Sequence, residues 1–181
     1  MNIRRKAIRK IVRNLLRQNR VLQAPVPLRR IAASLGLAIE QTPGNAENLS
    51  GFLVRDARAH TAIIGVNSSH PKNRQRFTIA HEIAHFLLHE GEPVYVDGRE
   101  TFRVDRRSFQ SSKGDHPDEI EANAFAAELL MPADLLRNDL DDVGEHVDLA
   151  DEDALKSLAK KYEVSVAAMS FRLANLGYIS L

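Results

Sequence analysis

Cysteine is absent from the 181 residues of this chain. This absence excludes a disulfide framework and a thiolate metal site, so any metal ion has to be held by histidine and carboxylate groups. No apolar run approaches the roughly 20 residues that span a bilayer. The first residues also lack the apolar segment and the small-residue cleavage site of a secretion signal. We therefore expect a cytoplasmic protein without a membrane partner.

Acidic residues are missing from the first 30 positions, which hold ten Arg or Lys, whereas residues 115–153 are strongly acidic. A basic arm of this kind is typical of proteins that bind nucleic acid or an anionic surface. However, no aromatic residue lies among these cations, as it would in a site that stacks bases. We therefore favour a solvated helix face that complements the acidic half of the same chain. Direct binding of nucleic acid is the less favoured alternative.

The hydrophobic pattern predicts a mixed α+β protein. Apolar residues recur with the helical period or alternate as in strands. The pattern predicts helices at 3–18, 28–35, 71–90, 118–131, 133–140, 154–161 and 165–176, and strands at 37–40, 50–54, 61–66, 94–96 and 101–104. We expect 50–54 and 61–66 to form an antiparallel hairpin beside the helix at 71–90. This hairpin either offers an edge to a peptide or only covers the core.

The segment RFTIAHEIAHFLLH contains the zinc-peptidase pattern H-E-x-x-H, formed by His81, Glu82 and His85. Residues four apart lie on one helix face, so both imidazoles can reach one metal ion. The remaining residues of this turn are mainly apolar, which predicts a buried helix whose polar strip binds metal or moves protons. The alternative is two hydrogen-bonded histidines and an exposed glutamate. We interpret His89 as a residue at the end of this helix rather than as a further ligand.

A second helix, DEIEANAFAAELLM, carries four alanines that permit close approach to another helix. Glu121 lies among these small and apolar residues, where a carboxylate is costly unless it is paired or coordinates a metal. Glu128 lies seven residues further on the same face and is its main rival as a ligand. Glu119 is a further alternative. The acids of the first turn suit the positive end of the helix dipole.

The two segments RFTIAHEIAHFLLH and EIEANAFAAELLMP together resemble the paired signatures of the ImmA/IrrE family of zinc metallopeptidases. The resemblance extends upstream to PVPLRRIAASLG and downstream through the last helices. It implies a zincin-like metallopeptidase domain with a small antiparallel sheet against the H-E-x-x-H helix. In such a gluzincin-like site one Zn²⁺ ion would be held by His81, His85 and Glu121, and Glu82 would be the catalytic glutamate.

We expect residues 1–140 to form the peptidase domain and residues 141–181 to form a helical hairpin packed on it. The last two helices have the spacing of a helix-turn-helix, but the final one offers only Arg172 as a cation, so we favour a packing role. In the mechanism, Glu82 would take a proton from the zinc-bound water and pass it to the leaving amine. His116 could support the tetrahedral intermediate, and Asn123 could support a ligand.

The resemblance implies a peptidase that cleaves one intracellular protein, a helix-turn-helix transcriptional repressor of phage, mobile-element or stress-response type. The alternative is a zinc-bound module without catalytic activity that binds a repressor or associates with DNA. The polar segment 106–117 between the two site helices is then a connector or, less favoured, a covering loop.

Overall fold

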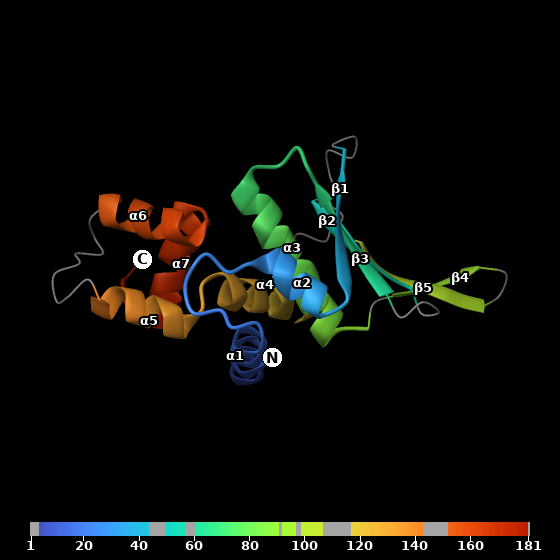
Figure 1. Ribbon diagram of the computed structural model, residues 1–181, viewed down its shortest axis with the longest axis horizontal. Coiled ribbons are helices and arrows are strands. Elements are labelled where there is room, and N and C mark those ends of the chain that lie inside the picture. Colours follow the sequence, from blue (N-terminus) through green and yellow to red (C-terminus); the bar gives the residue numbers. More distant parts are fainter. Residues whose placement is uncertain are drawn as a thin grey trace.

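The computed structural model describes residues 4–43, 50–56, 61–90, 92–96, 99–106, 117–142 and 152–180. Its helices are α1 (Arg5–Gln18), α2 (Leu28–Ser34), α3 (Lys72–Leu88), α4 (Pro117–Leu130), α5 (Ala133–Asp142), α6 (Glu152–Tyr162) and α7 (Val166–Leu176). Its strands are β1 (Leu37–Thr42), β2 (Gly51–Asp56), β3 (Thr61–Asn67), β4 (Glu92–Val96) and β5 (Arg99–Arg106). Figure 1 shows the sheet at one end, α5–α7 at the other, and α3 and α4 between them.

The five strands form one mixed sheet in the order β1-β3-β2-β5-β4. Strands β2 and β3 pair antiparallel, which confirms the expected hairpin, and β4 and β5 form the second one. Strand β1 pairs parallel with β3, so the sheet is mixed rather than wholly antiparallel. Because β2 and β3 both lie inside the sheet, they offer no free edge to a peptide, and of the two roles left open for their hairpin only the covering of the core remains.

Helix α3 packs against β2 and β3 on one side and against α4 on the other. Residues from Thr78 to His85 are all buried, which confirms the expected buried helix. The N-cap position is Pro71, and no side chain caps this end. In the turn before it, Asn67 accepts a hydrogen bond from the Ser69 amide at 2.9 Å. At the other end Arg55 of β2 donates to the carbonyls of His85 and His89, at 2.6 and 3.0 Å.

Helix α1 presents an apolar face to the core and a basic face to acidic residues of α4 and α5. Its buried residues are Ile8, Val12, Leu15 and Leu16. Arg4, Arg9 and Arg13 lie close to three carboxylates, those of Glu121, Glu128 and Asp134 respectively. The basic arm therefore complements acids of the same chain, as we favoured from the sequence.

The last two helices are tied to α4 and α5 by buried polar contacts. Arg172 of α7 is 9% exposed, donates to the Glu128 carboxylate at 2.5 Å and donates to the Met131 carbonyl at 3.0 Å. Tyr162 of α6 donates to Asp139 at 2.8 Å. Arg172 is thus engaged inside the protein rather than available to DNA. The domain boundary expected at residue 140 stays a prediction, since residues 143–151 lie outside the described part of the chain.

The residues that begin and end α7, and the glycine after α2, are of the types that usually occupy these positions. Ser165 accepts a hydrogen bond from the Ala168 amide at 3.1 Å, and Gly177 has the left-handed conformation that ends a helix. Gly36, at φ +75°, follows α2 in the same way. No helix among the described residues combines the length and apolar character needed to cross a membrane.

We predict that replacing Arg172 by Ala destabilises the protein by about 3–5 kcal/mol, because the Glu128 carboxylate then remains buried without its cation. Unfolding in urea would measure the loss. The double variant Glu128→Met/Arg172→Met should recover most of it, because neither charge remains. Lys156→Ala, which removes only exposed ion pairs, should change stability by less than about 1 kcal/mol. If the double variant were as unstable as Arg172→Ala, the unpaired Glu128 charge would not be the cause of the lost stability.

Candidate metal centre

Two imidazoles and one carboxylate meet in the space between α3 and α4. The Nε2 atoms of His81 and His85 lie 2.9 Å apart. The carboxylate oxygens of Glu119 lie 3.4 Å from His81 Nε2 and 3.2 Å from His85 Nε2. Among the described residues these three form a group whose ligand atoms all lie within 4.8 Å of one another. The arrangement is that of a three-residue site for one metal ion.

The donor set fits a divalent metal. His81 is fully buried and His85 is 6% exposed, and both direct the same ring nitrogen to one point. A tetrahedral ion bonded to both nitrogens at about 2.0–2.1 Å would hold them about 3.3 Å apart, close to the spacing observed. Without an ion, two lone pairs would face each other unless a proton lay between them. Two histidines and a glutamate are also a ligand set of catalytic zinc sites.

The carboxylate at this centre comes from Glu119 and not from Glu121, which the sequence had favoured. Glu121 is two residues further along α4, so its side chain is turned by about 200° around the helix axis. There it accepts hydrogen bonds from Arg4: from Nε at 2.9 Å, from the backbone amide at 3.3 Å, and from Nη2. These hydrogen bonds hold the pKa of Glu121 below its usual value. Its burial is therefore balanced by a cation rather than by a metal.

Glu128, the main rival for the ligand position, is also occupied elsewhere. Its carboxylate accepts from Arg172, and Arg9 lies 3.7 Å away. The pKa of Glu119 responds to two opposed effects. Burial raises it, but the interactions with the adjacent His81 and His85 rings outweigh burial and hold it well below its usual range. Glu119 is therefore an anion at neutral pH, the state in which a carboxylate binds a metal.

Asn123 holds the ring of His81 in place. Its side-chain oxygen lies 3.0 Å from His81 Nδ1. An amide oxygen can only accept, so this contact places the ring proton on Nδ1 and leaves the Nε2 lone pair for a metal. Asn123 and Glu119 are four residues apart on one face of α4, so one face supplies both a candidate ligand and the residue that orients His81.

Glu82 is 1% exposed and lies next to the two histidines on α3. Strand β2 passes close to it. A Cβ atom added at Gly51 would lie 3.8 Å from Glu82 Oε1, and only 2.3 Å from Thr78 Cγ2 and 2.7 Å from the Gly65 carbonyl. A residue without a side chain is therefore needed where the strand crosses the helix.

The other histidines have separate positions. His89 is the C-cap residue of α3 and lies 3.5 Å from Asp118, which agrees with a helix-end role. Burial lowers the pKa of His89, and Asp118 partly opposes this effect. His116, expected to support the reaction, lies outside the described residues, as do residues 107–116 of the segment 106–117 interpreted as a connector.

The structure brings His81 and His85 together as the sequence predicted, with Glu82 beside them on α3. Glu119 was named from the sequence only as an alternative to the favoured Glu121. The available signal was the spacing of Glu119 and Asn123, which puts a carboxylate and an amide four residues apart on one helix face. The expected burial of the Glu121 carboxylate was taken as a sign of metal binding. In the structure this carboxylate is paired with Arg4, a residue far away in the sequence.

The family model of the IrrE N-terminal-like domain, peptidase family M78, matches residues 32–174. The radiation response metalloprotease IrrE of Deinococcus deserti is 34% identical over 113 residues, which are 62% of this chain and 36% of that protein. IrrE of Deinococcus radiodurans is 31% identical over 111 residues, 61% of this chain and 30% of that protein. The similarity therefore spans about a third of the length of these relatives.

We predict that Glu119→Ala lowers the affinity for zinc by more than about 100-fold, the upper range for residues that only support a ligand. Glu121→Ala is the matched control. It removes an acid of the same helix that faces Arg4, so zinc affinity should stay close to that of the parent protein. Competition with a chromogenic chelator measures both. Loss of zinc from the Glu121 variant alone would restore the assignment made from the sequence.

We further predict that Gly51→Ala lowers stability by about 1–3 kcal/mol, because the added methyl group overlaps Thr78 and the Gly65 carbonyl. Thermal unfolding measures this change. Thr61→Ala, at an exposed position of β3, should shift stability by less than about 0.5 kcal/mol. A Gly51→Ala protein as stable as the parent would show that β2 and α3 are not closely packed at this point.

Proposed function

Because the chain belongs to the family of IrrE N-terminal-like metallopeptidase domains, we propose that it is a zinc-dependent endopeptidase that cleaves one specific protein. One observation carries this proposal. His81, His85 and Glu119 offer three ligand atoms at one point, and the buried Glu82 adjoins them on α3. Three protein ligands leave a coordination position for water or substrate, which distinguishes a catalytic zinc site from a structural one.

The proposed metal site consists of His81, His85 and Glu119. A zinc ion held there supplies a Lewis acid that polarises a carbonyl and acidifies water. Zinc is the ion we favour, because two imidazoles and a carboxylate without cysteine match its catalytic sites. The protein's own contribution is to hold these side chains in place. Asn123 orients His81, and Arg55 fixes the last turn of α3 to the sheet.

Glu82 is proposed as the general base and acid. It follows His81 directly in the helix, so it cannot join both histidines on one ion without distortion, but it lies close enough to exchange a proton beside them. In this role it accepts a proton from the attacking water and later donates it to the leaving amine. Burial suits this role, because it keeps bulk solvent from competing for the proton.

The architecture agrees with a zincin-like peptidase domain in which a helix with two histidines lies against a sheet. Strands β2 and β3 contact α3, and α4 brings the third ligand from the opposite side. The expected division into a peptidase domain, residues 1–140, and a C-terminal helical hairpin, residues 141–181, remains part of this proposal. The family match at 32–174 runs across that boundary.

We propose a helix-turn-helix repressor as the substrate, because of the resemblance to peptidases that act on such regulators. The relatives from Deinococcus are named radiation response metalloproteases, which is compatible with a regulatory peptidase. A small repressor encoded beside this gene is the natural candidate. Direct contact with DNA is not needed for this role, and three arginines of the basic helix already lie beside acids of the same chain.

We predict that Glu82→Gln keeps zinc bound but lowers the rate of repressor cleavage by about 10²–10⁴-fold, the usual contribution of general acid–base catalysis. The repressor encoded beside the gene is incubated with each variant, and the fragments are identified by mass spectrometry. Glu152→Gln, an exposed acid of α6, is the control that should cleave normally.

Two outcomes would contradict the proposal. If Glu82→Gln cleaves the repressor as fast as the parent protein, Glu82 is not the base. If neither protein cleaves but both relieve repression equally, the alternative function holds, in which a metal-bound module sequesters the repressor. A gel-shift experiment at two salt concentrations tests the DNA-associated form of that alternative, since phosphate contacts by several cations weaken steeply with salt.

A further inference from the structure

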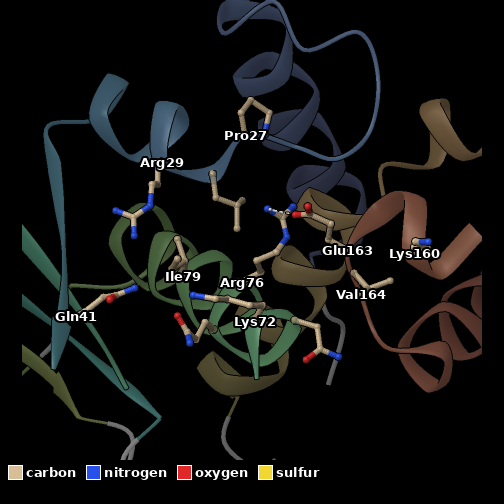
Figure 2. A pocket seen from close by; sticks show the side chains of 12 residues that line it. Pro27, Arg29, Gln41, Lys72, Arg76, Ile79, Lys160, Glu163 and Val164 are labelled. Atoms are coloured by element: carbon tan, nitrogen blue, oxygen red, sulfur yellow. Dashed lines mark ion pairs between the residues drawn. The ribbon is translucent and has the colours of Figure 1, made fainter. Parts of the chain in front are cut away.

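A cavity of about 640 Å³ lies between α2, the beginning of α3 and the turn that joins α6 to α7, and none of the candidate metal residues lines it. Figure 2 shows Arg29, Lys72, Arg76 and Glu163 around it. The peptidase proposal uses none of these residues. The volume lies within the range of about 300–1,000 Å³ that is typical of small-molecule sites.

The charge of the lining is strongly one-sided. Four cations, Arg29, Lys72, Arg76 and Lys160, face a single acid, Glu163. Within the described part of the chain, Arg29, Lys72 and Lys160 form no ion pair, so their charges are not neutralised by neighbouring carboxylates. This contrasts with the basic face of α1, where three arginines lie next to acids. A hollow with this excess of positive charge attracts anions.

Arg76 is the central cation, and only part of the hydrogen-bonding capacity of its guanidinium group is used. Its Nη1 lies 3.0 Å from a Glu163 carboxylate oxygen, and its Nη2 donates to the Val26 carbonyl at 3.0 Å. Its Nε is buried without a hydrogen-bond partner among the described residues. Burial lowers the pKa of Arg76, and Glu163 partly opposes this. An anion in the cavity would give this buried guanidinium a further counter-charge.

The beginning of α3 adds to the positive field. Lys72 is the first residue of this 17-residue helix, and no side chain caps this end. The positive end of the helix dipole therefore borders the cavity. A helix end alone would not define a site, but here it coincides with a cavity and with four cationic side chains.

The walls of the cavity are partly apolar. Leu28 from α2, Ile79 from α3 and Val164 from the turn before α7 contribute hydrophobic surface. Cations beside an apolar wall suit a ligand that has an anionic group on an apolar or aromatic body. Guanidinium groups bind phosphate through paired hydrogen bonds, and a phosphate monoester carries more negative charge than a single carboxylate.

We propose that this cavity is a binding site for a phosphorylated small molecule with a ring-shaped body, of the size of a nucleoside monophosphate. The phosphate lies among Arg29, Lys72 and Arg76, and the body packs against Leu28, Ile79 and Val164. The phosphate competes with Glu163 for Arg76. Arg76 and His81 belong to one helix and lie about 7.5 Å apart along its axis. A ligand in the cavity therefore contacts the same helix that carries the proposed peptidase residues.

Binding is tested by isothermal titration calorimetry with the whole protein at about 0.1 M salt, where distant charges are largely screened. The probes are adenosine monophosphate and adenosine, which share the ring and sugar but differ in the phosphate. We expect saturable binding of the monophosphate with one site per chain and no binding of adenosine. The measurement needs neither metal nor peptidase activity, so it is independent of the function proposed above.

Two variants with opposite expected effects on the affinity for the monophosphate test whether it binds in this cavity. Arg29→Gln/Lys72→Gln should weaken binding of the monophosphate by about tenfold or more, since two charge-assisted hydrogen bonds are lost. Its matched control is Lys10→Gln/Arg17→Gln, which removes two exposed cations of α1 and should leave affinity unchanged. Glu163→Gln should tighten binding, because Arg76 is released from its carboxylate, whereas Glu152→Gln should not.

Three results would overturn the proposal. The first is no binding of the monophosphate at millimolar concentration. The second is equal binding of adenosine, which would place the affinity in the ring alone. The third is an equal loss of affinity in the α1 control, which would mean that only the overall charge attracts the anion. Circular dichroism of each variant verifies that the fold is retained.

Discussion

The close contact between α3 and α4 is the constraint on which the rest of the structure depends. Four alanines on these helices, Ala80, Ala84, Ala122 and Ala126, are fully buried, and small side chains let helix backbones approach each other. Only at such a distance can a glutamate of one helix reach histidines of the other. The histidines are fixed by the sheet behind them and by Asn123 beside them.

Helix α1 supports this contact from outside. Its apolar residues cover α4, and its arginines lie beside Glu121, Glu128 and Asp134. Glu128 is the point where three parts of the chain meet, because Arg9 of α1 and Arg172 of α7 both approach it. The acids on the inner faces of α4 thus have two different kinds of partner. Glu119 faces the histidines, whereas the other two are neutralised by arginines from both ends of the chain.

Much of this fold could be predicted from the sequence because the patterns were local. The helical period of α1, the Ser165 and Gly177 caps and the H-E-x-x-H spacing depend only on residues near each other. The mixed sheet could not be derived in this way, because pairing β1 beside β3 is a long-range choice. The same applies to the acid beside the two histidines. Expecting Glu119 there rather than Glu121 required knowing that Arg4 lies against the other face of α4.

The core of this helix pair does not rely on the ligand residues. It consists of alanines together with larger apolar side chains such as Ile83 and Leu129. Replacing His81, His85 and Glu119 together by well-packed apolar side chains would therefore keep the architecture, since buried polar clusters can be exchanged in this way at little cost. Removing a single member would instead leave the other buried polar groups without their partner. The fold and the candidate metal centre are thus separable only when the cluster changes as a unit.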